Sequence, residues 1–186
     1  MIKKILLALV AIGILLVAGL AIAAFVAPTD CHVEREVTIN RPKEAVFDYV
    51  KHLKHQDTWG PWAKKDPNMK KEFRGNDGYV GFVSAWKSEN GELGSGEQEI
   101  KKIVEGERVD TELRFNEPFE SKSDAYMITE ATGPTTTKVK WGFATTFPRP
   151  MNVMLLVVDM DQMMGKDFEE GLSSLKAIME APPTVN

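Results

Sequence analysis

The feature that most constrains this chain is an uninterrupted apolar segment near its N-terminus. From Ile5 to Ala27, 23 consecutive residues are apolar or glycine, and Lys3 and Lys4 precede them. A helix of that length covers roughly 34 Å, which is enough to cross a bilayer core of about 30 Å. The sequence therefore predicts that residues 1–28 are a transmembrane anchor and that the globular part begins after them.

A cleaved secretory signal is the alternative interpretation of this segment. Signal peptides have apolar regions of roughly 7–15 residues, which favours a retained anchor here, although the small residues of 21–27 leave a cleavage site open. The two N-terminal lysines are expected to stay in the cytoplasm. We therefore expect a single-pass membrane protein with a cytoplasmic N-terminus and an extracytoplasmic soluble domain, periplasmic if the source is bacterial.

The charge of the soluble part argues against one class of partner. The chain of 186 residues has 23 basic and 27 acidic residues, and the apolar segment removes only Lys3 and Lys4, which leaves a charge of −6. Nucleic acid binding requires clustered Lys or Arg. The remaining basic pairs, such as Lys64-Lys65 and Lys101-Lys102, are dispersed. We expect no nucleic acid partner.

Metal and nucleophile chemistry find little support in the sequence. The single cysteine, Cys31, excludes an intramolecular disulfide and a cysteine-rich zinc site. Asp48, His52 and His55 have the spacing of one helical face, but only Asp57 is near enough to add a ligand, and a solvated helix face gives the same pattern. No Gly-x-Ser-x-Gly motif or phosphate-binding glycine loop is present. We predict no metal and no cofactor.

We place the soluble domain at residues 29–180. Hydrophobic periodicity predicts its first elements. Residues 32–39 alternate as a strand does. Asn40-Arg41-Pro42 then predicts a helix start, with an N-cap and an early proline, and Val46, Phe47, Val50 and Leu53 form its apolar stripe. Trp59-Gly60-Pro61-Trp62 indicates short turns rather than a long helix.

The sequence of the rest of the domain predicts a sheet followed by one long helix. From Lys71 to Phe147, half-apolar strands are separated by turn sequences that include Asn90-Gly91, which is typical of antiparallel hairpins. Asn152–Glu180 has helical periodicity. The sequence thus predicts an α+β fold, in which a curved antiparallel sheet of about seven strands wraps around a long C-terminal helix. Residues 181–186 are expected to be a flexible tail.

Several short motifs follow one another along the soluble part, namely Ile39–Phe47, Trp59–Trp62, Gly94–Glu97, Val139–Trp141 and Phe168–Lys176. In their order and spacing they resemble the START-like helix-grip superfamily, also called SRPBCC or polyketide cyclase/dehydrase-like proteins. The resemblance covers roughly residues 32–180. It implies a deep cavity between the sheet and the long helix that holds an apolar ligand, such as a lipid, sterol, polyketide or quinone. The superfamily has no universal catalytic motif, so no catalytic residue is carried over.

Candidate residues for such a cavity come from aromatic and apolar positions that share strand or helix faces. Asp161 stands out among them, because the predicted helix places its carboxylate near the apolar face. It would be a polar anchor or a general acid/base inside the cavity, or it would be paired with a tryptophan N–H, a tyrosine or a lysine at the cavity mouth. The full candidate set is Trp59, Trp62, Phe82, Ser84, Trp86, Leu113, Phe115, Tyr126, Trp141, Phe143, Val157, Met160, Asp161, Met164 and Phe168.

We therefore expect a membrane-anchored domain that binds an apolar small molecule or lipid without catalysis. Two alternatives stay open. One is an enzyme of the polyketide cyclase, dehydrase or hydrolase type that uses a cavity acid such as Asp161. The other is a protein-interaction module of the cell envelope. The sequence does not set the oligomeric state. Gly165 and Gly171, beside the predicted cavity, either leave room for a ligand or let the helix approach the sheet.

Overall fold

A computed structural model describes residues 2–182 of the chain, so residues 183–186 of the expected tail lie outside the described residues. The described chain forms two compact units, one containing residues up to Cys31 together with 146–160, and one containing residues 32–145 together with those from Asp161 onward. The elements are α1 (Ile2–Val26), β1 (Asp30–Ile39), α2 (Lys43–Val50), η1 (Leu53–His55), α3 (Gln56–Trp59), α4 (Pro61–Lys65), β2 (Lys70–Arg74), β3 (Val83–Lys87), β4 (Ser95–Val104), β5 (Arg108–Glu117), β6 (Ser121–Gly133), β7 (Thr136–Thr146), η2 (Met151–Leu156) and α5 (Met160–Glu180).

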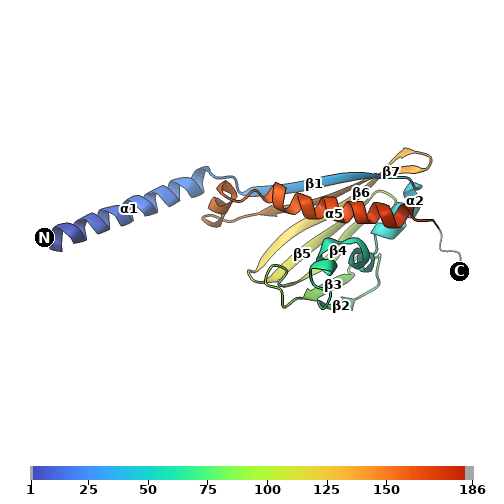
Figure 1. Ribbon diagram of the computed structural model, residues 1–186, viewed down its shortest axis with the longest axis horizontal. Coiled ribbons are helices and arrows are strands. Elements are labelled where there is room, and N and C mark those ends of the chain that lie inside the picture. Colours follow the sequence, from blue (N-terminus) through green and yellow to red (C-terminus); the bar gives the residue numbers. More distant parts are fainter. Residues whose placement is uncertain (1, 183–186) are drawn as a thin grey trace. The chain divides into compact units, whose positions relative to one another are not determined.

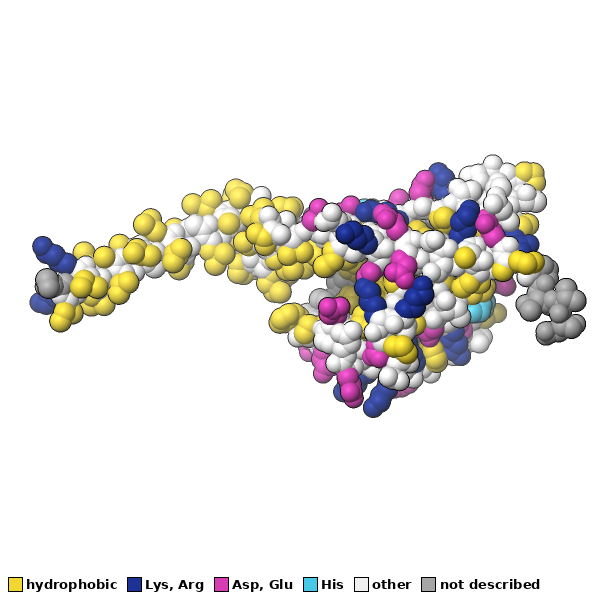
Figure 2. Space-filling model, viewed as in Figure 1, with side chains coloured by type: hydrophobic (Ala, Val, Ile, Leu, Met, Phe, Trp, Pro, Cys, Tyr) yellow, Lys and Arg dark blue, Asp and Glu magenta, His cyan; other side chains and the backbone are white. Residues whose placement is uncertain are grey.

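The first unit contains the apolar helix α1. Its 25 residues are long and apolar enough for a candidate membrane span, a trait that signal sequences share. Nearly all of its side chains are exposed. Figure 2 shows hydrophobic side chains along the visible surface of α1, with cationic side chains at its N-terminal end. An all-apolar exposed surface of this kind is unfavourable in water.

The C-terminal end of α1 is capped by residues that follow β7 in sequence. Asn152 is fully buried, and its amide nitrogen donates to the carbonyl oxygens of Ala24 at 2.8 Å and Ala27 at 3.0 Å. The guanidinium of Arg149 donates to the Ala24 carbonyl at 2.9 Å and lies 5.8 Å from the centre of the Phe25 ring. Because the last carbonyls of a helix have no partners within it, these two side chains supply them.

The second unit is built on a seven-stranded antiparallel sheet in the order β1-β7-β6-β5-β4-β3-β2. Each consecutive pair from β2 to β7 is antiparallel, as the short turns between them predict. At the turn between β4 and β5, Gly106 has φ +76°, a conformation that glycine adopts without steric cost. The first and last strands of the chain order, β1 and β7, lie together at one end of the sheet.

The long helix α5 lies across this sheet, and the short segments α2 to α4 lie beside its other strands (Figure 1). Phe168, Leu172 and Leu175 of α5 are buried. A sheet that is apolar on one face requires such a cover. The expected α+β fold, with seven antiparallel strands around a long C-terminal helix, is confirmed, and it is preceded by an apolar helix.

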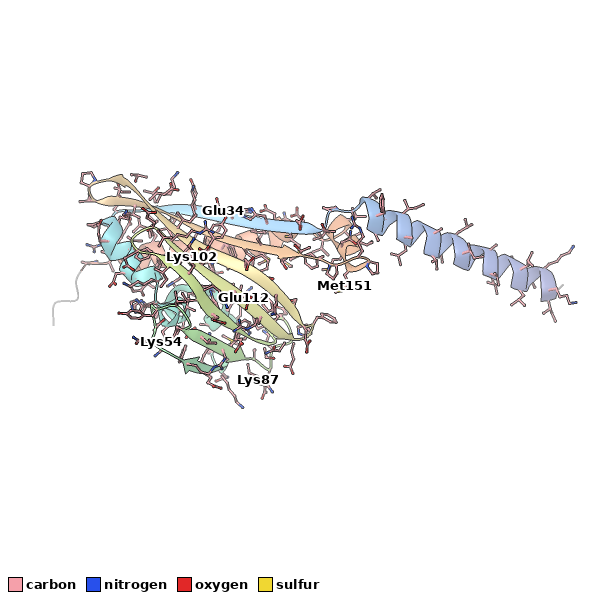
Figure 3. The ribbon with its side chains drawn as sticks, turned by 180° about the vertical axis from the view of Figure 1, so that it is seen from behind. Glu34, Lys54, Lys87, Lys102, Glu112 and Met151 are labelled. Carbon is pink, nitrogen blue, oxygen red and sulfur yellow. The ribbon has the colours of Figure 1, made fainter. Side chains whose placement is uncertain are left out.

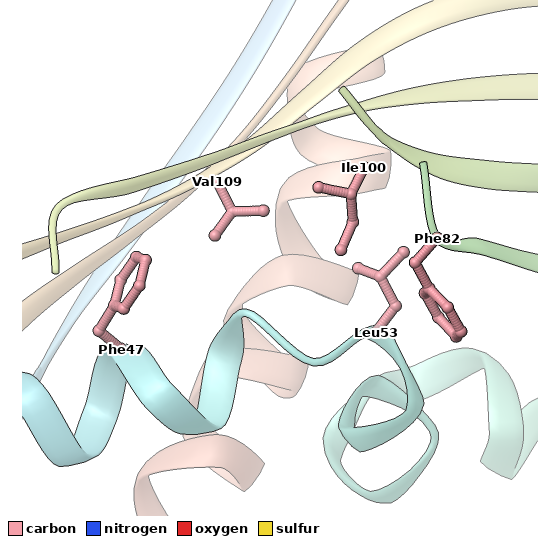
Figure 4. Close-up of a cluster of buried hydrophobic side chains, with 5 residues drawn as sticks. All are labelled: Phe47, Leu53, Phe82, Ile100 and Val109. Atoms are coloured by element: carbon pink, nitrogen blue, oxygen red, sulfur yellow. The ribbon is translucent and has the colours of Figure 1, made fainter. Parts of the chain in front are cut away.

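A buried cluster joins the first helical segments to the sheet. Phe47 of α2 and Leu53 of η1 pack with Phe82, Ile100 and Val109, and the five side chains point toward one another in Figure 4. All five are at most 3% exposed. Filling this end of the space between helices and sheet leaves the other end for a pocket.

The prediction of one helix over Asn152–Glu180 is wrong at its start. Residues 151–156 form the 3₁₀-helix η2, and α5 begins only at Met160. Two β-branched residues, Val157 and Val158, lower helix propensity at the break. Asp159 directly before Met160 is a residue type favoured at helix N-caps, so the sequence contained a start signal that periodicity overrode.

Two predictions about α2 also need correction, namely its N-cap and the helical face shared by Asp48, His52 and His55. Pro42, rather than Asn40, is the N-cap residue, and no side chain caps the helix there. Since α2 ends at Val50, His52 and His55 do not continue one helical face with Asp48. In the described residues no group of three His, Cys, Asp or Glu side chains is arranged to hold a metal ion.

The outer face of the sheet carries an ion-pair network around Arg114. Its guanidinium donates to Glu97 at 2.8 Å, to Glu99 at 2.7 Å and also to Glu112, which Figure 3 labels on this face. Bonds from Arg74 and Arg114 lower the pKa of Glu97, and the bond from Arg114 lowers that of Glu99. A carboxylate whose pKa is lower in the folded state stabilises the fold at neutral pH and less so in acid.

Replacing this arginine is expected to leave three acidic side chains close together. We predict that Arg114→Gln lowers the free energy of unfolding at pH 7 by about 1 kcal/mol. Because the folded pKa values lie below the ordinary 4.5, the difference from wild type should shrink as the pH falls below 4.5. Urea unfolding followed by tryptophan fluorescence measures this. The control is Lys101→Gln, whose exposed ammonium pairs with Glu99. A loss that is independent of pH contradicts the prediction.

Candidate functional site

The second unit contains a pocket of about 210 Å³ between the inner face of the sheet and α5. Its walls come from the helices α3, α4 and α5, from strands β2 to β7, and from the connections before β2 and between β3 and β4. The lining residues are Gln56, Asp57, Trp62, Ala63, Met69, Lys71, Ser84, Trp86, Glu92, Leu93, Gln98, Leu113, Phe115, Ala125, Trp141, Phe143, Met164, Asp167 and Phe168.

Strand register explains why these residues meet. Alternate residues of a strand face the same side, and directly opposed residues on neighbouring strands share that side. Ser84 on β3 is opposite Gln98 on β4, which is opposite Leu113 on β5. Ala125 on β6 is opposite Phe143 on β7. Two-residue periodicity therefore brings side chains from five strands to one concave face.

Trp141 forms the centre of the aromatic wall. Its ring stacks on Phe168 of α5, with centroids 4.2 Å apart and planes 7° apart. Trp59 and Trp62 contact it edge-on, at 5.0 Å and 5.3 Å. Offset-stacked and edge-to-face rings are the favourable aromatic geometries. The wall therefore joins the sheet to α5 and to the short helices.

A second aromatic pair bounds the pocket on the β3–β5 side. Trp86 meets Phe115 edge-on, with centroids 5.8 Å apart. The indole nitrogen of Trp86 donates to the carbonyl oxygen of Leu93 at 3.1 Å, so its polar atom has a partner within the protein. Gly96 makes room for the indole, since a Cβ there would lie 2.7 Å from it. The ring therefore presents an apolar face to the pocket.

Two ion pairs occupy the rim. Asp57 pairs with Lys71 at 2.8 Å, and Asp167 pairs with Lys65 at 2.7 Å. All four side chains are partly exposed, so their charges contact water. Each carboxylate at these positions is neutralised by a neighbouring ammonium. Glu92 of the β3–β4 connection is a further lining carboxylate and is exposed, so the rim is polar and charged.

A few uncharged polar groups lie inside. The Gln98 amide donates to the Thr111 hydroxyl at 3.0 Å, and that hydroxyl donates to the Ala125 carbonyl at 3.3 Å. Ser84, directly opposite Gln98, is 6% exposed. These amide and hydroxyl groups offer hydrogen bonds on an otherwise apolar surface, which is the pattern of small-molecule pockets.

The structure distinguishes the two interpretations of the α5 glycines. A Cβ at Gly171 would lie 2.8 Å from the Trp141 ring, and a Cβ at Gly165 would lie 2.1 Å from the Arg35 guanidinium. Neither glycine lines the pocket. Both therefore serve the close approach of α5 to neighbouring side chains rather than leaving space for a ligand.

Nine of the fifteen candidate residues line this pocket. Their contact with a ligand stays a prediction. They are Trp62, Ser84, Trp86, Leu113, Phe115, Trp141, Phe143, Met164 and Phe168.

The other six candidates do not line the pocket, and four of them lie in the core or before the second turn of α5. Trp59 is fully buried behind Trp141, and Phe82 belongs to the core cluster of Figure 4. Val157 is 84% exposed and precedes α5, and Met160 is the first residue of that helix. Their predicted positions on the cavity face relied on a helix that continued through residues 157–159.

Tyr126 lies on the outer face of the sheet, contrary to the face we assigned to it. Its hydroxyl donates to the Glu34 carboxylate, and the Arg108 guanidinium lies 4.3 Å from its ring centre. Burial, together with the bond to Glu34, raises the pKa of Tyr126 to about 12. The neighbouring Ala125 faces the pocket instead. Because residues 125–128 are all apolar or aromatic, their sequence does not distinguish the two faces.

Asp161 lies at the exposed start of α5 and does not line the pocket, contrary to its place among the cavity candidates. Its carboxylate forms an ion pair with Arg35 at 2.9 Å, and its side chain is 61% exposed. Arg35 also pairs with Glu169 at 2.8 Å. The bond from Arg35 lowers the pKa of Asp161. The carboxylate is paired, but its donor is an arginine rather than the tryptophan, tyrosine or lysine expected from the sequence.

Sequence reasoning missed lining residues that are polar, that are small or that lie outside regular elements. Gln98 is on the inner face of β4 and Ala125 on that of β6, whereas Met69 and Leu93 lie in connections. Counting outward from Ile100 along the strand would have placed Gln98 on the inner face. No periodic signal exists for the connections.

Comparison with known proteins assigns a family and a fold. A family model described as "Polyketide cyclase / dehydrase and lipid transport" matches residues 30–180. No curated protein sequence matches significantly. Similar solved structures include a protein from Thermobifida fusca (15% identity, 83% of this chain and 99% of that chain, TM-score 0.59). Others are Mll3558 from Rhizobium loti (17%, 80% and 96%, TM-score 0.58) and the Aha1 dimer from Colwellia psychrerythraea (14%, 81% and 96%, TM-score 0.54). At these identities the structures indicate the fold alone.

Proposed function

The chain belongs to the polyketide cyclase/dehydrase and lipid transport family, and from this premise we propose that it binds a compact apolar molecule in the pocket beneath α5 while α1 anchors it in a membrane. The observation that carries the proposal is the pocket itself. Aromatic and aliphatic side chains surround it, with Ser84 and Gln98 as interior polar groups. A ligand with one hydrogen-bonding group and an apolar body matches this surface.

The size of the pocket limits the ligand. Pockets for drug-sized molecules have volumes of about 300–1,000 Å³, and this one has about 210 Å³. It therefore suits a ring system of one or two rings, or part of an acyl chain, better than a whole phospholipid. The aromatic wall around Trp141 favours flat, ring-containing ligands, because stacked and edge-on contacts are available there.

The polar groups favour binding over catalysis. A general acid or base needs a titratable group within hydrogen-bond reach of the reacting atom. The Asp57 and Asp167 carboxylates are paired with lysines at the rim, and the histidines of the described chain do not line the pocket. Glu92, an exposed residue of the β3–β4 connection, is the third carboxylate among the lining residues. Binding an apolar molecule needs no titratable group, whereas acid–base catalysis would need Glu92 to reach the ligand or one of these pairs to separate.

Membrane anchoring fits both the helix and the ligand class. The 25-residue α1 has exposed apolar side chains and a pair of lysines at its start. Such lysines favour the cytoplasmic side. Apolar molecules concentrate in bilayers, so a tether to the membrane keeps the binding domain near their source. Retention of α1 is part of this proposal.

Photolabelling tests the binding site in the full chain. The probe is 3-(trifluoromethyl)-3-(m-iodophenyl)diazirine, a small apolar aromatic reagent, applied to protein in detergent, and adducts are mapped by mass spectrometry. We expect saturable adducts on pocket residues such as Met69 and Met164. An excess of iodobenzene, added before illumination, should prevent these adducts from forming. It should not affect the adducts on α1, which serve as the internal control. Labelling of α1 without saturable pocket adducts would contradict the proposal.

The same assay tests the role of Asp161. We predict that Asp161→Asn leaves saturable pocket labelling unchanged, because this carboxylate is exposed and pairs with Arg35. The neighbouring carboxylate Glu169 still pairs with Arg35 in the variant. Loss of pocket adducts in Asp161→Asn, with fluorescence-detected unfolding unchanged, would show that the residue does act on the ligand.

A further inference from the structure

The segment between β7 and α5 exposes apolar side chains beside the end of α1. Residues 151–158 carry no charge, and Asn152 is their only polar residue. Asn152 is fully buried against α1, so hydrophobic side chains are left to face outward. The exposed ones are Met151 at 51%, Met154 at 37%, Leu156 at 53% and Val157 at 84%.

Backbone hydrogen bonds stabilise the conformation of this segment. The amides of Val157 and Val158 both donate to the carbonyl oxygen of Met154, at 3.1 Å and 2.8 Å. The amide of Phe147 donates to the Thr29 carbonyl at 2.8 Å, which holds the beginning of the segment against the residues after α1. The exposed side chains are therefore presented by a hydrogen-bonded turn.

Its bonds to α1 place it at a defined level of that helix. Asn152 and Arg149 bind the carbonyl oxygens of Ala24, Phe25 and Ala27, in the last turn and just beyond it. A helix of 25 residues spans about 37 Å, and a bilayer core about 30 Å, so this end reaches the boundary between core and head groups. Met151, labelled in Figure 3, comes from the turn beside this end of α1.

We propose that segment 151–158 inserts into the bilayer surface, with its exposed side chains among the lipid acyl chains next to α1. This rests on the proposed anchoring by α1. Contiguous exposed apolar surface marks a membrane or protein interaction site. Continuity with the apolar surface of α1, where Phe25 and Val26 are also exposed, identifies lipid as the occupant.

The insertion also explains the caps. In a bilayer, backbone carbonyls without partners are costly because no water is available to them. Asn152 and Arg149 satisfy the end of α1 from within the protein, which allows this turn to lie below the water-exposed layer. The cationic Arg149 at the C-terminal end of the helix also has a favourable interaction with the helix dipole. Segment 151–158 thus acts as a second, non-covalently linked contact with the membrane.

Depth-dependent fluorescence quenching tests this in the full chain. We would attach the environment-sensitive dye NBD to Val157→Cys in a Cys31→Ser background and reconstitute the protein in phosphatidylcholine vesicles. Two further labelled variants are controls. Ile14→Cys lies in the middle of α1, and Glu89→Cys lies at an exposed position after β3. Val157 is the most exposed side chain of the segment, so its replacement does not disturb the core.

Insertion predicts that NBD at position 157 has blue-shifted emission and loses intensity when lipids with a doxyl group near the head group are added. NBD at position 14 should respond to doxyl groups deep in the chains, and NBD at position 89 to neither. Quenching at position 14 with water-like emission at position 157 overturns the insertion while anchoring stands. Absence of lipid quenching at both positions overturns the anchoring and the insertion together.

Discussion

Trp141→Ala is expected to lower the free energy of unfolding of the second unit by about 3–5 kcal/mol, the range for removing a large buried aromatic side chain. Trp141 is 3% exposed, stacks on Phe168 of α5 and contacts Trp59 and Trp62. Its loss would remove the contact between sheet, long helix and short helices at once. No rearrangement of one neighbour fills so large a space, so a cavity term adds to the lost burial.

Urea unfolding monitored by tryptophan fluorescence measures this change, because all four tryptophans of the chain lie in the second unit. The three that remain report the same transition in the variant. The control is Phe119→Ala, since Phe119 is 73% exposed, and a shift within about 0.5 kcal/mol is expected there. A loss below about 1 kcal/mol in Trp141→Ala would mean that the aromatic wall does not hold the helix to the sheet.

Filling the pocket gives the second large effect. Ala125 is 5% exposed, lies on the inner face of β6 and lines the cavity, so the ring of Ala125→Phe would project into the space proposed for the ligand. We predict that saturable photolabelling of Met69 and Met164 falls at least about tenfold, which corresponds to 1.4 kcal/mol of lost binding. Labelling of α1 should not change.

The matched control is Ala131→Phe, which places the same side chain at an exposed position of the same strand. It should label like wild type. Overpacking typically costs 1–3 kcal/mol, so both variants are also compared by fluorescence-detected unfolding, and Ala125→Phe must remain folded under the labelling conditions. Equal pocket labelling in a folded Ala125→Phe and in wild type would place the ligand elsewhere.

The sequence predicted the sheet side of the candidate site well wherever a strand has one clearly apolar face. Trp141 and Phe143 alternate with polar or small residues, so two-residue periodicity determines which face they occupy. For their neighbours on β6, periodicity does not predict which side chains face the pocket. Residues 125–128 are apolar or aromatic on both faces, and only the pairing of Ala125 with Phe143 shows which face is inward.

The helical side shows a different limit. Periodicity places Met164 and Phe168 correctly, because both lie within α5. The same extrapolation fails for Val157, because it continues the helical phase through a segment where the backbone is not helical. Asp161 shows a third limit. A residue's angular position on a helix does not tell whether that turn of the helix is covered, and the first turn of α5 is exposed.

Identification of a co-purifying ligand would test the central claim most directly. The full chain, extracted from its source membrane in a mild detergent, would be analysed by native mass spectrometry, and the released small molecules would be identified. The account predicts one compact apolar molecule per wild-type and per Ala131→Phe chain, and its absence from Ala125→Phe. A protein without any stoichiometric small molecule, or the same molecule bound equally to Ala125→Phe, would contradict the claim that this pocket binds an apolar ligand.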